Sequence, residues 1–178
     1  MHAKLFLPVL LGLLAVSAGA LARPFSASQE KKNYLTDMEA DKIRDAMDPG
    51  DRIRLYISFA EERLKNFQYE LSRKTPEGRR EDILNSLLNG YIGCVDDGTD
   101  QIEIAREHQV DIRSALKLFE SKDKEFLAQL QKIDKTSPDY DMYSDTLADA
   151  IEGTQEDLKD VQDALKELNP APVRRKPS

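Results

Sequence analysis

Apolar residues recur with an alternating spacing of four and three between Glu77 and Ile133. Twelve residues follow this ladder: Leu84, Leu88, Tyr91, Val95, Ile102, Ala105, Ile112, Leu116, Phe119, Phe126, Leu130 and Ile133. Only Gly98, Gln109 and Asp123 occupy positions where the ladder requires an apolar residue. This spacing places apolar side chains on one helix face and is typical of helices that pack along their length. It predicts one long amphipathic helix or two helices in the same phase.

Helix-start signals divide the rest of the chain. Thr36 and Glu39 have the three-residue spacing of a capping box, which predicts a short helix that ends near Met47. A capping residue followed by proline marks three further starts: Asp48-Pro49, Thr75-Pro76 and Ser137-Pro138. The helices that follow are expected to end near Lys74, Lys135 and Leu168. Apolar stripes run along the first and last of these: Ile53, Ile57, Ala60, Leu64, Phe67 and Leu71, and then Tyr143, Leu147, Ile151, Thr154, Leu158, Val161, Leu165 and Leu168.

The predicted fold class is all-α: an antiparallel helical bundle of three to four long helices plus a short N-terminal helix. The segment 96–100 leaves two arrangements open. If Gly98 ends a helix and Thr99 caps the next, the chain forms a four-helix up-down bundle. Without a turn, a helix of about 60 residues would extend for about 90 Å. The apolar phase passes through Gly98 undisturbed, which favours a continuous helix.

Both ends of the chain differ from this helical region. Residues 1–22 combine a basic start, an apolar run and two A-x-A sites, the pattern of a cleaved signal peptide. Residues 23–34 are expected to be a flexible leader, 35–168 the helical bundle domain, and 169–178 a disordered, Pro-rich basic tail. The protein is therefore expected to be exported, to the periplasm or the extracellular medium, with no stable membrane insertion after cleavage.

Charge and cysteine content restrict the partners. The formal net charge is −7; the predicted signal peptide contributes one positive residue, Lys4, and the tail contributes three, so residues 23–168 carry about −11. A region with this much negative charge repels nucleic acids and anionic lipid surfaces, so neither is an expected partner. Cys94 is the only cysteine, which excludes intrachain disulfides. It is either a small apolar residue beside the ladder or the site of an intermolecular disulfide in a homodimer.

Few residues of the chain suit catalysis or metal binding. His108 is the only histidine after residue 22, and no nucleophile motif, phosphate loop or paired cysteines occur. We therefore expect no enzyme and no cofactor. Two acidic clusters are calcium candidates: Asp96, Asp97 and Asp100, and Asp139, Asp141 and Asp145. The first cluster lacks the closing Glu of an EF-hand, and carboxylates in a first helical turn are expected without an ion.

Two stretches resemble known families. Leu35-Thr36-Asp37-Met38-Glu39 resembles the Leu-Thr-x-x-Gln motif of small periplasmic stress chaperones, with Glu39 in place of Gln. The helical region, including Phe59-Ala60-Glu61-Glu62-Arg63-Leu64, resembles exported helical bacterial proteins of unknown function. These resemblances imply a helical fold and export. The signal peptide, the helical periodicity and the lack of a catalytic arrangement favour a non-enzymatic protein that acts through protein contacts as an envelope adaptor or scaffold. The alternatives are a chaperone-like holdase and a metal- or small-ligand-binding bundle.

Overall fold

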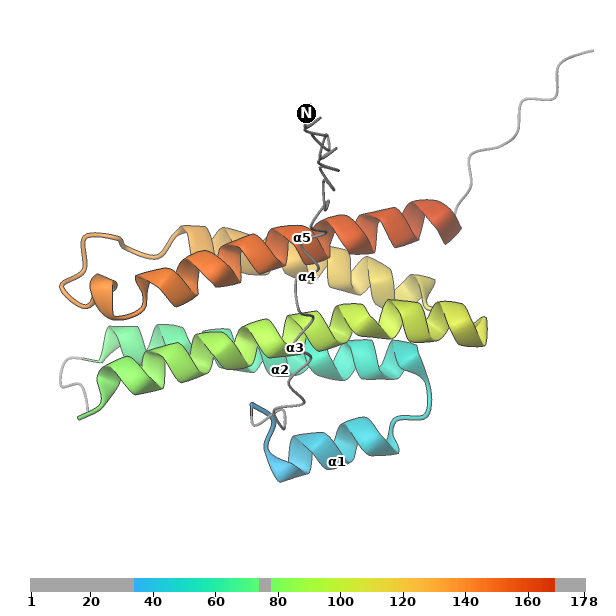
Figure 1. Cartoon of the computed structure of the whole chain (residues 1–178), viewed down its shortest axis with the longest axis horizontal. Coiled ribbons are helices and arrows are strands. Elements are labelled where there is room, and N and C mark those ends of the chain that lie inside the picture. Colours follow the sequence, from blue (N-terminus) through green and yellow to red (C-terminus); the bar gives the residue numbers. More distant parts are fainter. Residues whose placement is uncertain (1–33, 74–77, 169–178) are drawn as a thin grey trace, which may run out of the picture.

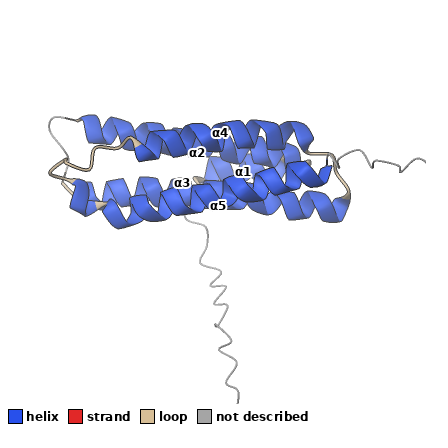
Figure 2. Cartoon of the chain, turned by 90° about the horizontal axis from the view of Figure 1, so that it is seen from above, coloured by secondary structure: helices blue, strands red, loops and turns tan. Residues whose placement is uncertain are grey.

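The computed structural model describes residues 34–73 and 78–168, and these residues form helices and connections without a strand (Figures 1 and 2). The expected all-α fold is confirmed. The elements are α1 (Asp37–Asp45), α2 (Pro49–Ser72), α3 (Arg80–His108), α4 (Arg113–Gln131), the 3-10 helix η1 (Tyr140–Met142) and α5 (Ser144–Leu168). None of these helices is both long enough and apolar enough to cross a membrane.

The four long helices lie side by side as a bundle, and α1 packs on its outside (Figures 1 and 2). α3 touches α2 and α5, and α4 touches the same two helices. Each long helix therefore has two neighbours, and the apolar stripes of all four meet along the centre. Eleven of the twelve ladder residues are buried and Ile133 is partly buried, so the ladder is the core face that the sequence predicts.

Gly98 lies inside α3, which confirms that the helix is continuous there. A glycine suits this ladder position because Phe119 of α4 packs directly against it. A Cβ added at Gly98 would lie 3.1 Å from the Phe119 ring. The small residue thus leaves room for the Phe119 ring, which reaches α3 across the core from α4, and the ladder continues through Gly98 without an apolar side chain.

The long helix nevertheless ends at His108, so the expectation of a continuous helix of about 60 residues is wrong. Gln109 adopts a left-handed conformation with φ of 56°. Its N–H bonds to Arg106 O, and the N–H of Val110 bonds to Ala105 O at 2.9 Å, which is the Schellman way of ending a helix. After the connection 109–112, the apolar residues of the next helix continue the same four-three spacing. The periodicity therefore does not reveal the turn.

The cap predictions have mixed outcomes. Thr36 and Glu39 form the expected capping box, with N–H to side-chain distances of 2.8 and 3.2 Å. Asp48 accepts from Gly50 N–H at 2.7 Å, with Pro49 opening α2. The Thr75-Pro76 start falls outside the described residues.

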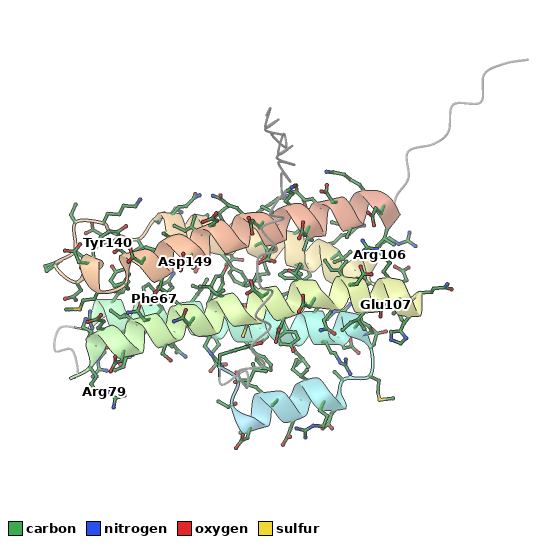
Figure 3. The ribbon with its side chains drawn as sticks, in the orientation of Figure 1. Phe67, Arg79, Arg106, Glu107, Tyr140 and Asp149 are labelled. Atoms are coloured by element: carbon green, nitrogen blue, oxygen red, sulfur yellow. The ribbon has the colours of Figure 1, made fainter. Side chains whose placement is uncertain are left out.

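The predicted start at Ser137-Pro138 is wrong, because residues 137–143 form turns and η1, and α5 begins at Ser144. Aromatic packing anchors this connection. The Tyr143 ring packs edge-on against Phe67 of α2 with centroids 5.3 Å apart, and against Tyr140 at 5.7 Å. Phe67 and Tyr140 lie at the end of the bundle opposite Arg106 (Figure 3).

Polar contacts hold α1 against the bundle, in addition to the packing of Ile43 on the core. Arg63 of α2 donates to the Glu39 carboxylate at 2.7 Å and to the carbonyl of Tyr34 at 3.0 Å. The Tyr34 ring lies over Gly93, where a Cβ would be 2.7 Å from it, and its hydroxyl donates to Asp97. Tyr34, the last residue of the predicted flexible leader, is therefore packed. The rest of that leader, the signal peptide and the tail lie outside the described residues.

Candidate functional site

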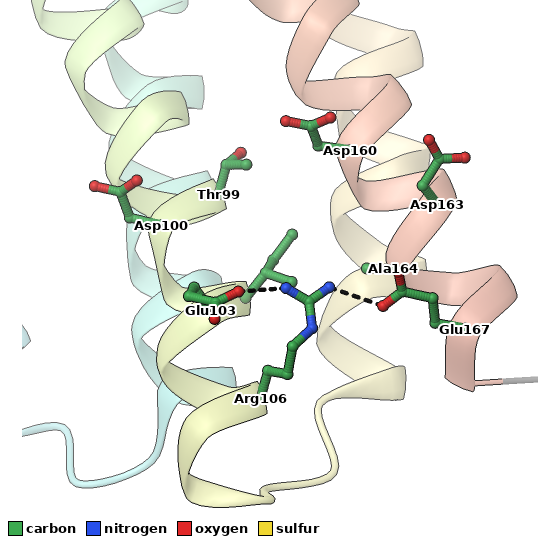
Figure 4. A pocket seen from close by; sticks show the side chains of 9 residues that line it. Thr99, Asp100, Glu103, Arg106, Asp160, Asp163, Ala164 and Glu167 are labelled. Atoms are coloured by element: carbon green, nitrogen blue, oxygen red, sulfur yellow. Dashed lines mark hydrogen bonds and ion pairs between the residues drawn. The ribbon is translucent and has the colours of Figure 1, made fainter.

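A groove of about 380 Å³ runs between α3 and α5 near the end of the bundle that carries Arg106 (Figure 4). Its lining residues come from consecutive turns of the two helices: Thr99, Asp100, Ile102, Glu103 and Arg106 of α3, and Asp160, Asp163, Ala164 and Glu167 of α5. Because residues three and four apart share a helix face, each helix presents one row of polar side chains along the groove.

Five carboxylates and a single guanidinium line the groove. Arg106 donates to Glu103 on its own helix and to Glu167 of α5 at 2.8 Å, so it bridges the two walls (Figure 4). Asp163 pairs with Lys166 at 2.7 Å. Asp100 and Asp160 are exposed and have no basic partner among the described residues. The groove therefore keeps an excess of negative charge, which attracts cationic groups.

An apolar pocket of about 140 Å³ adjoins the groove at the end of the bundle. Its apolar lining consists of Ile102, Ala105, Val110, Ile112, Leu116, Ala164 and Leu168. Arg106 and Glu167 line both cavities, so the bridging ion pair stands between the acidic groove and the apolar pocket. The turn at Gln109 creates this pocket, because it places Val110 and Ile112 at the end of α3 and opposite the last turn of α5.

The first calcium cluster is not brought together as a site. Asp97 is buried and accepts the hydroxyl of Tyr34, whereas Asp96 and Asp100 are exposed. Asp100 lines the groove, while Asp96 does not. The continuous helix through Gly98 therefore points these three carboxylates into different surroundings, instead of folding them around one centre.

The second calcium cluster is also separated. Asp139 accepts from Arg80 of α3 at 2.8 Å, and Asp141 and Asp145 are exposed on η1 and α5. Among residues 34–73 and 78–168, no three His, Cys, Asp or Glu side chains are grouped so that they could hold a metal ion.

Cys94 is buried in the core of the bundle with 0% exposure. Burial raises the pKa of its thiol to about 12, so the reactive thiolate is disfavoured. This position matches the interpretation of a small apolar residue beside the ladder. A disulfide to a second chain would require the bundle to open at this point.

A buried acidic pair is the feature that the sequence interpretation missed. Asp123 of α4 has 0% exposure, and neither of its carboxylate oxygens has a hydrogen-bond partner among the described residues. Asp157 of α5 is 8% exposed. Burial raises the pKa of both, to about 8 for Asp123, where the charge of Asp157 adds to the effect, and to about 7 for Asp157. The sequence did mark Asp123 as unusual, because it occupies a ladder position that should be apolar. No such signal marked Asp157, because the apolar stripe predicted for the last helix contains its neighbour Leu158 instead.

His108 is exposed at the last position of α3, away from the acidic pair and from both cavities. No family model matches the chain, and neither does any curated protein or solved structure.

Proposed function

We propose that the protein is an exported, non-enzymatic, antiparallel helical bundle that acts through protein contacts, as an envelope adaptor or scaffold. The groove between α3 and α5 is the contact surface. The observation that carries this proposal is the juxtaposition of the acidic groove with the apolar pocket across the bridge from Arg106 to Glu167. A partner segment with Lys or Arg beside an apolar side chain is complementary to both cavities.

The charge of the groove favours such a segment over an anionic or purely apolar one. Asp100 and Asp160, which have no basic partner among the described residues, would each face a basic side chain of the partner. The apolar residue would enter the pocket beside Leu116 and Leu168. The net negative charge of the protein also attracts a basic segment over longer distances, which speeds association at low ionic strength.

The holdase alternative is less well supported. A holdase needs a continuous apolar face, but the exposed large apolar side chains of the described residues are Met38, Met47, Tyr69, Leu118 and Met142. They belong to five different segments, namely α1, the connection to α2, α2 itself, α4 and η1. Isolated exposed apolar residues are normal for a protein that does not bind unfolded clients.

Binding of a labelled peptide that alternates Arg and Leu tests the proposal. The double variant Asp100→Asn and Asp160→Asn removes two charges that support no contact within the described fold. We expect affinity to fall about 5- to 20-fold, because two exposed ion pairs contribute roughly 1–2 kcal/mol together. A peptide that alternates Arg and Ser should bind more weakly, because it leaves the pocket empty.

The matched control is the double variant Asp141→Asn and Asp149→Asn, which removes two exposed acids of the described fold outside the groove. It should bind the peptide as the unaltered protein does at moderate salt. If both double variants lose the same affinity, binding reflects net charge only and the groove is not the contact surface.

A further inference from the structure

The two buried carboxylates lie on the core faces of adjacent helices. Asp123 occupies the ladder position between Phe119 and Phe126 of α4, and all three side chains are buried. Asp157 lies between Thr154 and Val161 in the buried series of α5. Since α4 and α5 pack against each other along their length, the pair forms a polar layer within an otherwise apolar core.

The groups around this layer supply no positive charge. From α3, the Tyr91 hydroxyl is paired with Thr154 at 2.6 Å. The Thr99 side chain faces Asp157 and opposes part of the effect of burial on its pKa, whereas Asp96 adds negative charge near Asp157. From α5 itself, Glu156 and Asp160 also add negative charge.

On the α2 side, the charged residues that reach α4 are Arg54 and Glu61, which lie at the surface of the bundle. Arg54 pairs with Asp51 at 2.9 Å and donates to the hydroxyl of Ser114. Glu61 pairs with Lys122 at 3.4 Å. Lys122 and Lys124 flank Asp123 in sequence, but Lys124 pairs with Glu120 at 2.6 Å, so both lysines are engaged at the surface of the bundle. No Lys, Arg or His of the described residues is paired with either buried carboxylate.

Two like charges cannot both persist in such a layer. An ionised carboxylate that is removed from water without a partner is strongly disfavoured, and a second carboxylate nearby increases the penalty. Binding a proton removes one charge and supplies the O–H donor that the unpartnered Asp123 oxygens otherwise lack. A divalent cation fits less well, because two carboxylates provide few of the six to eight oxygens that calcium takes, and no third acidic or histidine ligand joins them among the described residues.

We propose that Asp123 and Asp157 form a buried proton-binding site that holds α4 against α5, and that the bundle loosens at this layer when the pair loses its proton. The two carboxyl groups titrate as one coupled unit. Because the ligand is a proton, the site makes the stability of an exported protein respond to the pH of its surroundings.

The direction of the pH effect follows from the raised pKa values. Unfolded aspartates titrate near ~3.9. The folded pair titrates at about 7 and about 8, so the folded state holds the proton where the unfolded state has lost it. The stability that the pair contributes is fully present below about pH 4, falls as pH rises, and is lost above about pH 8.

Denaturant unfolding between pH 5.5 and pH 9 tests the site. For the unaltered protein, the unfolding constant should rise by up to about tenfold per pH unit for each proton held. The double variant Asp123→Asn and Asp157→Asn should lose this slope and exceed the unaltered protein in stability at pH 9. The matched control is Asp149→Asn, an exposed acid on α5 (Figure 3), which should keep the slope.

Infrared spectroscopy of the unaltered protein provides a second readout that does not depend on whether the variants fold. A protonated carboxyl band should be present at pH 6 and absent at pH 9. A flat stability profile without this band would overturn the proposal, and so would a slope that survives in the double variant. Stabilisation at pH 8 by calcium, magnesium or manganese chloride, lost in the double variant, would assign the site to a metal ion and equally overturn it.

Discussion

Glu39 and Asp123 are both buried carboxylates, but among the described residues only Glu39 is paired with a cation. Burial alone would raise the pKa of Glu39, yet hydrogen bonds from Arg63 and from Thr36 hold it below its usual value. Asp123 lacks such donors, so burial and the charge of Asp157 raise its pKa to about 8. The comparison shows that a nearby hydrogen-bonding cation, and not burial itself, decides whether a buried carboxyl group joins two elements as an ion or as a neutral acid.

Arg80 extends the comparison to a guanidinium. It is 8% exposed and donates to the Glu70 carboxylate at 3.2 Å, to the Glu70 carbonyl at 2.8 Å and to Asp139 at 2.8 Å. These contacts join α2, α3 and the segment before η1 at the end of the bundle opposite the groove. Every charge of this cluster is paired, whereas the layer of Asp123 and Asp157 contains charges of one sign only.

The largest effect is expected when a buried pair loses its cation. Among the described residues, Arg80→Met leaves the buried Glu70 carboxylate with only Arg73 as an ionic partner, at 3.0 Å, and leaves Asp139 without one. We expect a loss of about 3–5 kcal/mol in the free energy of unfolding at pH 7, measured by denaturant titration. Arg79→Met is the matched control, since the Arg79 side chain is 82% exposed and pairs with the exposed Asp82, and it should change the stability little. Equal losses in the two variants would contradict the assigned role of burial.

Removing the charge of the unpaired carboxylate should have the opposite sign at high pH. At pH 9, Asp123→Asn should be more stable than the unaltered protein, on the order of 2–4 kcal/mol, because the amide cannot ionise in the core. At pH 5 the order should reverse by about 1 kcal/mol, since the amide adds buried donors that need partners. Thermal unfolding at both pH values measures this crossover. A variant that is less stable at both would show that Asp123 has a partner as an ion.

The paired carboxylate should respond at the acidic end of the pH scale. Glu39→Gln weakens the contact with Arg63, and we expect about 1–3 kcal/mol less protection of α1 at pH 7 by amide hydrogen exchange. The folded pKa of Glu39 is lowered, so its contribution is present above the unfolded value near ~4.3 and is lost as pH falls through the folded one. The difference between Glu39→Gln and the unaltered protein should therefore vanish in strong acid. A difference that persists there would point to packing rather than charge.

The smallest effect is expected for a pair that stays in water. Glu167→Gln removes the partner of Arg106 across the groove, where the two side chains are 63% and 51% exposed. Exposed ion pairs contribute little to folding because water solvates both charges. The midpoint of urea unfolding should stay within experimental error at every salt concentration. A clear destabilisation would mean that the bridge between the groove and the pocket also supports the fold.

The sequence predicted the parts of this structure that depend on local patterns. The capping box at Thr36, the start at Asp48 and the buried ladder all follow from short-range rules. The turn at Gln109 was hidden because the connection preserves the apolar phase, although Gln109 was one of the three polar ladder positions. The start of α5 was misplaced because tertiary packing of Tyr143 on Phe67 determines the path of that segment.

The candidate site was harder to predict than the fold. The groove depends on which faces of α3 and α5 meet. The sequence of either helix alone does not determine this pairing of faces. Asp100 was identified only as a calcium candidate, and the structure places it in the groove instead. Asp123 was recognised as an exception on the ladder, but its partner Asp157 lies 34 positions later in the printed sequence and could be paired with it only in three dimensions.

A carboxyl-carbon NMR titration of the whole protein tests most directly whether partners decide the state of buried acids. Between pH 3 and pH 10, Glu39 should titrate below its usual range, and Asp123 and Asp157 should titrate as a pair in two steps, at about pH 7 and about pH 8. Resonances of Asp123 and Asp157 that titrate in the ordinary acidic range, together with Glu39, would contradict the account.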